Sequence, residues 1–199
     1  MNLLRAVLAV LLVCAAPALA GAGQPTDDLK SYIDRVVTIL EDPAMTGAAH
    51  ATERQHAIET VAGEGLDLHE AARRTLAQYW DARTPAEQTR FVELFTALIY
   101  GSYLVRVSHY NGERVAFDDE AVAGNAAVVK ARVIATDGDV TPVEFRLVRN
   151  GGERWKVWDA SFEGMSLIGN YRSQFARIIR SASYAELVKR LESHAPPAK

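Results

Sequence analysis

Residues 155–175, WKVWDASFEGMSLIGNYRSQF, join a predicted strand to a predicted helix. Apolar and polar side chains alternate from Arg154 to Ser161, as they do in a strand with one buried face. Glu163-Gly164 breaks this strand, and residues 165–168 follow as an apolar loop. Aromatic and aliphatic side chains then recur at helical spacing over residues 171–179. The stretch therefore predicts a strand-to-helix crossover that packs on a sheet.

Three more segments with alternating side chains precede this stretch. They are Arg114–Asp118, Ala126–Ala135 and Thr141–Val148, and turn signals containing glycine separate them. The spacing predicts a strongly curved antiparallel sheet of three or four strands. The acidic residues 118–120 begin at the last residue of the first segment, and we expect them to form a solvated loop.

The first half of the chain has the spacing of helices. Residues 26–40 carry an amphipathic face, and further helices are predicted around residues 52–61 and 67–80. A longer helix is predicted from Pro85 to about Tyr110, where Thr84 and Glu87 have the spacing of a capping box. This helix is apolar over so much of its circumference that we expect it to be buried on more than one side. Helices followed by a meander of strands indicate an α+β fold.

The N-terminus has the pattern of an export signal. Residues 1–20 hold a single charge, a short apolar run and the small residues Ala18 and Ala20, so we predict a cleavable signal peptide. Residues 21–199 then form one domain with a flexible tail over 194–199. The chain has 199 residues, a formal net charge of −3 and one cysteine, Cys14, which leaves with the signal. These numbers exclude thiolate chemistry and argue against a dedicated nucleic-acid binder.

Candidate catalytic and metal-binding residues are few. Asp159 lies near the end of the predicted last strand, on the same face as Val157, and a carboxylate on an apolar face is a candidate general base. The alternative is that Asp159 caps the following turn or pairs with an arginine. The other candidates, each with a structural alternative, are His109, Glu144, Glu163 and the Glu53-x-x-His56 pair. We predict no catalytic residue and no metal site, because no second metal-ligand motif accompanies that pair.

The residues from Trp155 to Phe175 resemble the signature of the MlaC family, also called toluene-tolerance auxiliary proteins. The shared pattern is a tryptophan-rich strand that ends in Asp, then Glu-Gly-Met-Ser, then the Asn-Tyr-Arg-x-x-Phe helix. Residues 84–88 and 109–112 are also similar, and the resemblance extends over residues 66–191. One departure is residues 66–68, Leu-Asp-Leu, where many members have a phenylalanine.

The resemblance implies a non-enzymatic periplasmic lipid carrier without a cofactor. Its fold resembles nuclear transport factor, with a curved antiparallel sheet covered by N-terminal helices and a C-terminal helix around an apolar cavity. Such carriers shuttle phospholipid between an outer-membrane lipoprotein–porin complex and an inner-membrane ABC transporter with a substrate-binding ring, and so maintain outer-membrane asymmetry. Contacts with the membrane complexes would be transient. The alternatives are hopanoid-related lipid transport and an enzyme that acts on a small hydrophobic substrate with Asp159 as base.

The residues expected to contact acyl chains come from the long helix, the inward faces of the strands and the crossover. They are Phe91, Phe95, Leu98, Tyr103, Val107, Val129, Val133, Val143, Phe145, Leu147, Val157, Met165, Leu167, Tyr171 and Phe175.

Overall fold

A computed structural model describes residues 24–107, 110–152 and 154–194. The predicted signal peptide, His109 and residues 195–199 of the predicted tail lie outside the described residues. The α-helices are α1 Pro25–Glu41, α2 Ala51–Gly65, α3 Leu68–Leu76, α4 Pro85–Val107, α5 Leu167–Ser181 and α6 Tyr184–His194. The strands are β1 Arg114–Ala123, β2 Ala126–Ile134, β3 Val140–Val148, β4 Lys156–Phe162 and β5 Met165–Ser166.

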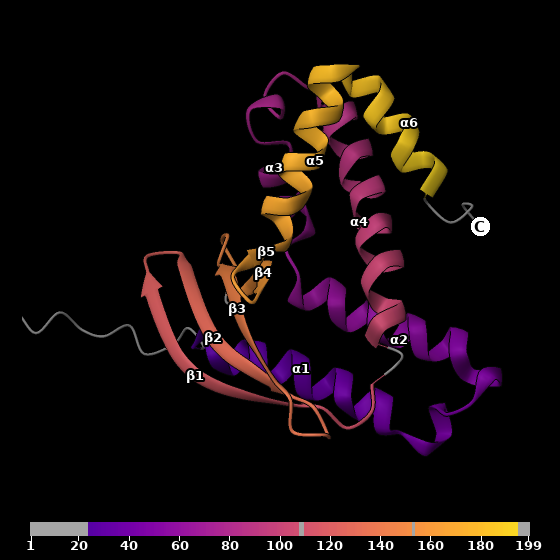
Figure 1. Ribbon diagram of the computed structural model, residues 1–199, viewed down its shortest axis with the longest axis vertical. Coiled ribbons are helices and arrows are strands. Elements are labelled where there is room, and N and C mark those ends of the chain that lie inside the picture. The colour runs from indigo at the N-terminus through magenta and orange to yellow at the C-terminus, as the bar shows by residue number, and fades with distance from the viewer. Residues whose placement is uncertain (1–23, 108–109, 153, 195–199) are drawn as a thin grey trace, which may run out of the picture.

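The strands form one antiparallel sheet in the order β1-β2-β3-β4-β5, so each strand pairs with the next along the chain. Helices precede and follow the sheet, which confirms the predicted α+β fold. In Figure 1, α1 runs along the sheet, while α3, α4, α5 and α6 gather at the other end of the molecule. No helix in the described part of the chain is long and apolar enough to cross a membrane.

The prediction of a solvated loop over residues 118–120 is wrong, because these residues continue β1. A bulge shifts the register between Phe117 and Asp119 and lets the strand run on to Ala123. Basic residues of β2 stabilise the acidic segment: Arg132 contacts Asp118 at 2.6 Å, and the Lys130 ammonium lies 3.6 Å from the Asp119 carboxylate. Cross-strand pairing of opposite charges therefore makes an acidic edge compatible with a strand.

The prediction of an apolar loop over residues 165–168 is also wrong. Met165 and Ser166 form β5, and α5 begins directly at Leu167. Glu163 and Gly164 have φ values of 51° and 80°, as the two central residues of a type I′ hairpin turn require. The tight turn brings the chain straight back along β4, so no loop separates the sheet from α5.

Two separate hydrophobic cores hold these elements together. The larger one, which we call the helical core, lies among α3, α4, α5 and α6. The smaller one lies where Leu29 of α1 packs against the sheet and Trp155. Helix α4 begins with the predicted capping box, in which the Thr84 amide donates to Glu87 at 2.8 Å and the Glu87 amide donates to Thr84 Oγ1 at 3.3 Å.

Candidate functional site

A cavity of about 1200 Å³ lies between the two cores. Its walls are α1, α2, the second half of α4, the inner face of the sheet and the first turns of α5. Helix α1 contributes the aliphatic stripe Leu29, Ile33, Val36, Val37 and Leu40, which recurs at the spacing of one helix face. Helix α2 adds Ile58 and Val61 on the neighbouring wall. The cavity is therefore lined mainly by hydrocarbon.

Part of the predicted contact set lies in this lining. Tyr103 and Val107 are on α4, Val133 and Phe145 are on adjacent strands, and Val157 is on β4. The predicted residues of the crossover, Met165 and Leu167, also line the cavity. Their contact with a ligand stays a prediction.

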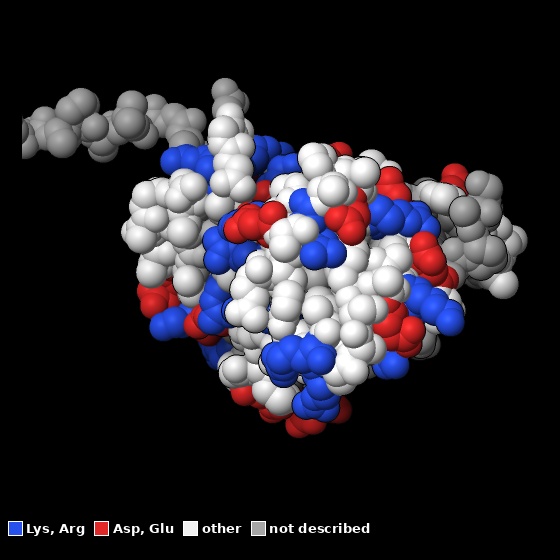
Figure 2. All heavy atoms as spheres, turned by 90° about the horizontal axis from the view of Figure 1, so that it is seen from above, with Lys and Arg blue, Asp and Glu red and all other residues white. Residues whose placement is uncertain are grey.

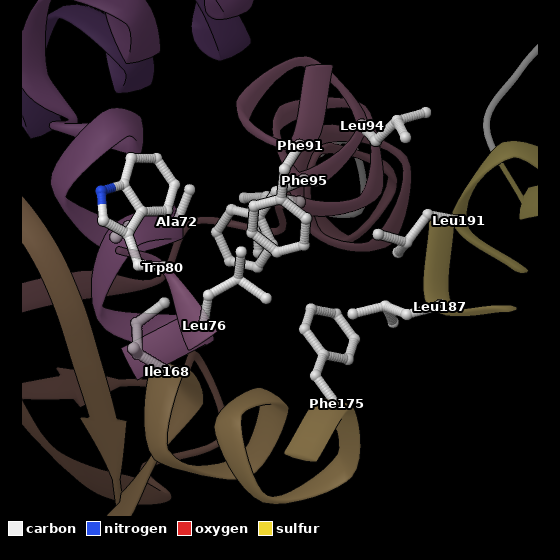
Figure 3. Close-up of a cluster of buried hydrophobic side chains, with 12 residues drawn as sticks. Ala72, Leu76, Trp80, Phe91, Leu94, Phe95, Ile168, Phe175, Leu187 and Leu191 are labelled. Carbon is white, nitrogen blue, oxygen red and sulfur yellow. The ribbon is translucent and has the colours of Figure 1, made fainter. Parts of the chain in front are cut away.

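A second part of the predicted set belongs to the helical core and lies outside the lining. Phe91 and Phe95 stack with ring centroids 6.0 Å apart, and Phe175 meets both rings edge-on. Tyr171 lies edge-on to Phe95 at 5.9 Å, and Leu98 packs against the same core. Figure 3 shows Phe175 of α5 pointing toward the rings of Phe91 and Phe95. These aromatic side chains join α4 to α5.

The remaining predicted residues are buried in the sheet. Val129 and Leu147 belong to the smaller core, and Val143 is 3% exposed opposite Ala131. The prediction used alternation along each strand, and alternation distinguishes the two faces of a sheet. It does not tell which part of the inner face meets the cavity and which part meets α1.

Helices α1 and α2 supply lining residues that the predicted contact set left out. The signal for α1 was present in the sequence, because Leu29, Ile33, Val36 and Leu40 follow the amphipathic spacing. Such a stripe has the same pattern whether it covers a packed core or an open cavity. Only the position of α1 beside the sheet makes it a cavity wall.

Polar groups in the lining are concentrated on α5 and on tyrosines. Asn170 and Ser173 of α5 and Glu113 before β1 are the main ones. The Asn111 amide donates to the Glu113 carboxylate at 2.7 Å, and this hydrogen bond lowers the pKa of Glu113. The Tyr110 hydroxyl donates to Glu41 at 2.8 Å, and this hydrogen bond raises the pKa of Tyr110. These groups can meet a polar head while the aliphatic walls meet hydrocarbon.

Asp159 does not share a face with Val157, so the prediction from simple alternation is wrong. The register pairs Leu147 with Val157 and Arg146 with Asp159, which leaves Trp158 as an extra residue in a bulge. The bulge turns Asp159 away from the cavity, where its carboxylate accepts from Arg146 at 2.8 Å and from the Ile168 amide at 3.0 Å. Asp159 therefore matches the structural alternative: it pairs with Arg146 and caps the first turn of α5.

The other candidate residues have ordinary partners. Glu144 pairs with Arg146 at 2.6 Å, and Glu163 is an exposed residue of the β4–β5 turn. In the Glu53-x-x-His56 pair, the exposed His56 ring lies 3.6 Å from Glu59, and the exposed Glu53 carboxylate lies 3.4 Å from His50. Among the described residues, no group of three or more His, Cys, Asp or Glu side chains has the arrangement of a metal site.

Figure 2 shows that acidic and basic side chains are interspersed on the face seen from above, toward the end where α5 and α6 meet. A surface with both signs of charge has only weak attraction for an anionic bilayer. Among the described residues on that face, no single broad basic patch is seen.

Comparisons with known proteins agree with this arrangement. The family model described as MlaC protein matches residues 30–193. The toluene tolerance protein ttg2D of Pseudomonas putida is 28% identical over 178 residues, which cover 88% of this chain and 82% of that protein. The structure of a phospholipid-binding protein from Ralstonia solanacearum, in complex with a phospholipid, superposes with a TM-score of 0.75. It is 22% identical, covers 86% of this chain and 96% of its own, and shows the same fold.

Proposed function

This chain belongs to the MlaC family, and from that premise we propose that it carries a phospholipid with its acyl chains in the cavity. The observation that carries the proposal is the cavity itself. It measures about 1200 Å³ and has aliphatic walls from α1, α2, α4 and the sheet. The polar residues Glu113, Asn170 and Ser173 would lie near the head group.

The energy of acyl-chain burial supports a site of this kind. Each buried methylene contributes about 0.8 kcal/mol, so a chain of about sixteen carbons gains on the order of 12 kcal/mol in a membrane. A carrier must offer nearly the same apolar shelter, because otherwise the lipid stays in the bilayer. Apolar cavity walls that contact water destabilise the folded protein, and a bound ligand removes that contact.

The similar proteins support the same ligand class. The Ralstonia protein is described as phospholipid-binding and its structure contains a phospholipid. This chain shares that fold, which supports a ligand of the same class for the cavity. Family membership further supports a shuttle between an outer-membrane complex and an inner-membrane transporter.

We also propose that the carrier works in the periplasm after residues 1–20 are removed. The apolar run and small residues of that segment support export. The net charge of −3 and the mixed surface charges support brief contacts with membranes, so delivery would depend on partner proteins.

Native mass spectrometry of the exported protein tests the proposal. We expect a bound phospholipid in the wild type, loss of that lipid in Val133→Asp, and retention in Val122→Asp. Val133 is half-buried and lines the cavity, whereas Val122 on β1 is 51% exposed and lies outside its lining. Recovery of wild type without lipid, together with no uptake from phosphatidylethanolamine–phosphatidylglycerol vesicles, would contradict the proposal. A bound hopanoid would favour the alternative ligand.

A further inference from the structure

Asp159 is a buried carboxylate that the proposed lipid site does not use. Its side chain is 2% exposed and its oxygens have three donors from outside β4. Oδ2 accepts from Arg146 Nη1 at 2.8 Å and from Ser166 Oγ at 2.7 Å, while Oδ1 accepts from the Ile168 amide at 3.0 Å. Arg146 is on β3, Ser166 is on β5, and Ile168 is in the first turn of α5. One carboxylate thus connects three elements.

The turn that Asp159 holds lies between the cavity and the helical core. Leu167, Gly169 and Asn170 line the cavity, whereas Ile168 is 2% exposed and belongs to the helical core. Ser166 adds a second connection, because its hydroxyl oxygen also accepts from the Gly169 amide at 2.8 Å. The position of this turn therefore sets the position of one cavity wall.

The same segment forms part of the cavity mouth. Phe162 and Met165 pair across the tight turn, and they are 43% and 70% exposed although both line the cavity. Large apolar side chains that are both exposed and part of the lining mark where the cavity meets solvent. We call residues 162–170 the rim segment.

We propose that Asp159 is a positioning residue that fixes the rim segment and thereby limits the rate at which a lipid enters and leaves. The inference rests on the proposed function. A buried charge with three donors is costly to unpair, so the rim segment has one strongly preferred position. Asp159 makes no hydrogen bond to the aliphatic walls of α1 and α2 in the described residues. Its substitution should therefore change the amount of lipid bound at saturation only slightly.

The test compares Asp159→Asn with Ser166→Ala. The first substitution keeps the size of the side chain and removes its charge, and the second removes one donor to Asp159 together with the α5 cap. Asp118→Asn is the matched control, because Asp118 forms a carboxylate–arginine pair with Arg132 in the same sheet, on β1. Asp118 lies outside both the rim segment and the lining.

The measurement is transfer of fluorescent phosphatidylethanolamine from the loaded protein to phosphatidylethanolamine–phosphatidylglycerol vesicles, followed by stopped flow. Hydrogen bonds to charged groups contribute enough that we expect transfer about tenfold faster in Asp159→Asn and several-fold faster in Ser166→Ala. In Asp159→Asn, saturation binding should remain near the wild-type amount, because Asp159 lies outside the lining. The control should transfer at the wild-type rate.

A double variant separates positioning from general destabilisation. If Asp159 acts through its pair with Arg146, then adding Arg146→Gln to Asp159→Asn should accelerate transfer no further. Wild-type transfer rates in both folded single variants would overturn the inference and leave the proposed carrier function standing. Should Asp159→Asn fail to fold, the rate of Ser166→Ala decides the matter. A wild type that takes up no lipid would instead overturn the proposed function.

Discussion

Tyr32 and Gly65 meet where α1 and α2 cross beside the cavity. A Cβ atom on Gly65 would lie 2.8 Å from the Tyr32 ring, closer than van der Waals contact allows. Tyr32 is 7% exposed and lines the cavity, and burial raises the pKa of its hydroxyl. The absence of a side chain at residue 65 thus lets two cavity helices approach closely.

Gly65→Ala should therefore destabilise the protein by about 1–3 kcal/mol, as expected for overpacking. Gly63→Ala is the matched control, because its Cβ would meet only the Tyr100 hydroxyl at an ordinary 3.8 Å. Alanine in a helix is favoured over glycine, so the control should be neutral or stabilising by about 0.5–1 kcal/mol. Urea unfolding measures both values, and equal stabilities of the two variants would contradict the explanation.

Glu70 of α3 carries an acid-sensitive interaction. Its carboxylate accepts from Arg73 at 2.8 Å and from Arg74 at 2.6 Å. Chiefly because of the hydrogen bonds from Arg73, the pKa of Glu70 falls from 4.5 to about 2. Arg74 also lies over the Trp158 ring at 3.9 Å, so the group links α3 to β4.

A carboxylate with a lowered pKa in the folded state stabilises the protein above its unfolded pKa, and this stabilisation is lost as the pH falls toward the folded pKa. Stability should therefore decrease between about pH 4.5 and about pH 2. A shift of this size corresponds to about 3 kcal/mol, which solvent near the half-exposed arginines reduces to about 1–2 kcal/mol. Thermal unfolding of Glu70→Gln should lack this part of the acid dependence. An unchanged pH profile in that variant would contradict the assignment.

At the scale of elements, α4 serves two environments along its length. Its first half contributes Phe91 and Phe95 to the helical core, and its second half contributes Tyr103 and Val107 to the cavity. A helix with two kinds of partner needs apolar residues on more than one side. The all-round apolar pattern predicted this burial correctly.

The two halves of α4 should respond differently to substitution. Phe95→Ala should cost about 3–5 kcal/mol of folding stability, because Phe95 is fully buried among three other aromatic rings. Val107→Lys should change stability little, since a cation is favoured at a helix C-terminus, but its charge should reduce lipid occupancy. Chemical denaturation and lipid extraction measure the two effects. Full lipid occupancy in folded Val107→Lys would contradict the placement of α4.

The sequence predicted which segments are helices and strands better than it predicted where strands bulge, extend or connect to helices. Alternation and turn signals predicted three or four strands of the five-stranded sheet, and helical spacing predicted the main helices. The misassigned places depend on one extra residue or one distant partner: the bulge at Trp158 reversed the face of Asp159, and Arg132 makes Asp118 compatible with β1. Local periodicity contains no information on either, because a bulge and an ion pair are both properties of paired strands.

At the scale of the whole molecule, the cavity separates two cores that a fully packed domain would join. Apolar composition predicted burial but could not distinguish contact with another side chain from contact with a ligand. Phe91 and Tyr103 belong to the same apolar helix, yet only Tyr103 lines the cavity. The family resemblance supplied the expectation of a cavity. The structure then showed that α1 and α2 form two of its walls.

Because the lipid would complete the interior, its removal should destabilise the whole protein. A methylene group occupies roughly the volume of a water molecule, about 30 Å³, so the cavity has space for roughly 40 such groups. Two chains of about sixteen carbons fit that space, whereas the single chain of a lysophospholipid leaves more than half of it empty. Stripped protein should therefore gain more stability from a diacyl phospholipid than from a lysophospholipid.

The gain follows from mass action, because a ligand that binds only the folded state stabilises it by about 2.7 kcal/mol at a hundred times its Kd. For a domain of this size, that corresponds to a rise in Tm of roughly 5–10 °C. Val133→Asp should show a much smaller rise, since its carboxylate would occupy the apolar lining. Equal Tm values for stripped and reloaded wild type would mean that the cavity walls are stable without a ligand, and would argue against a lipid that completes the interior.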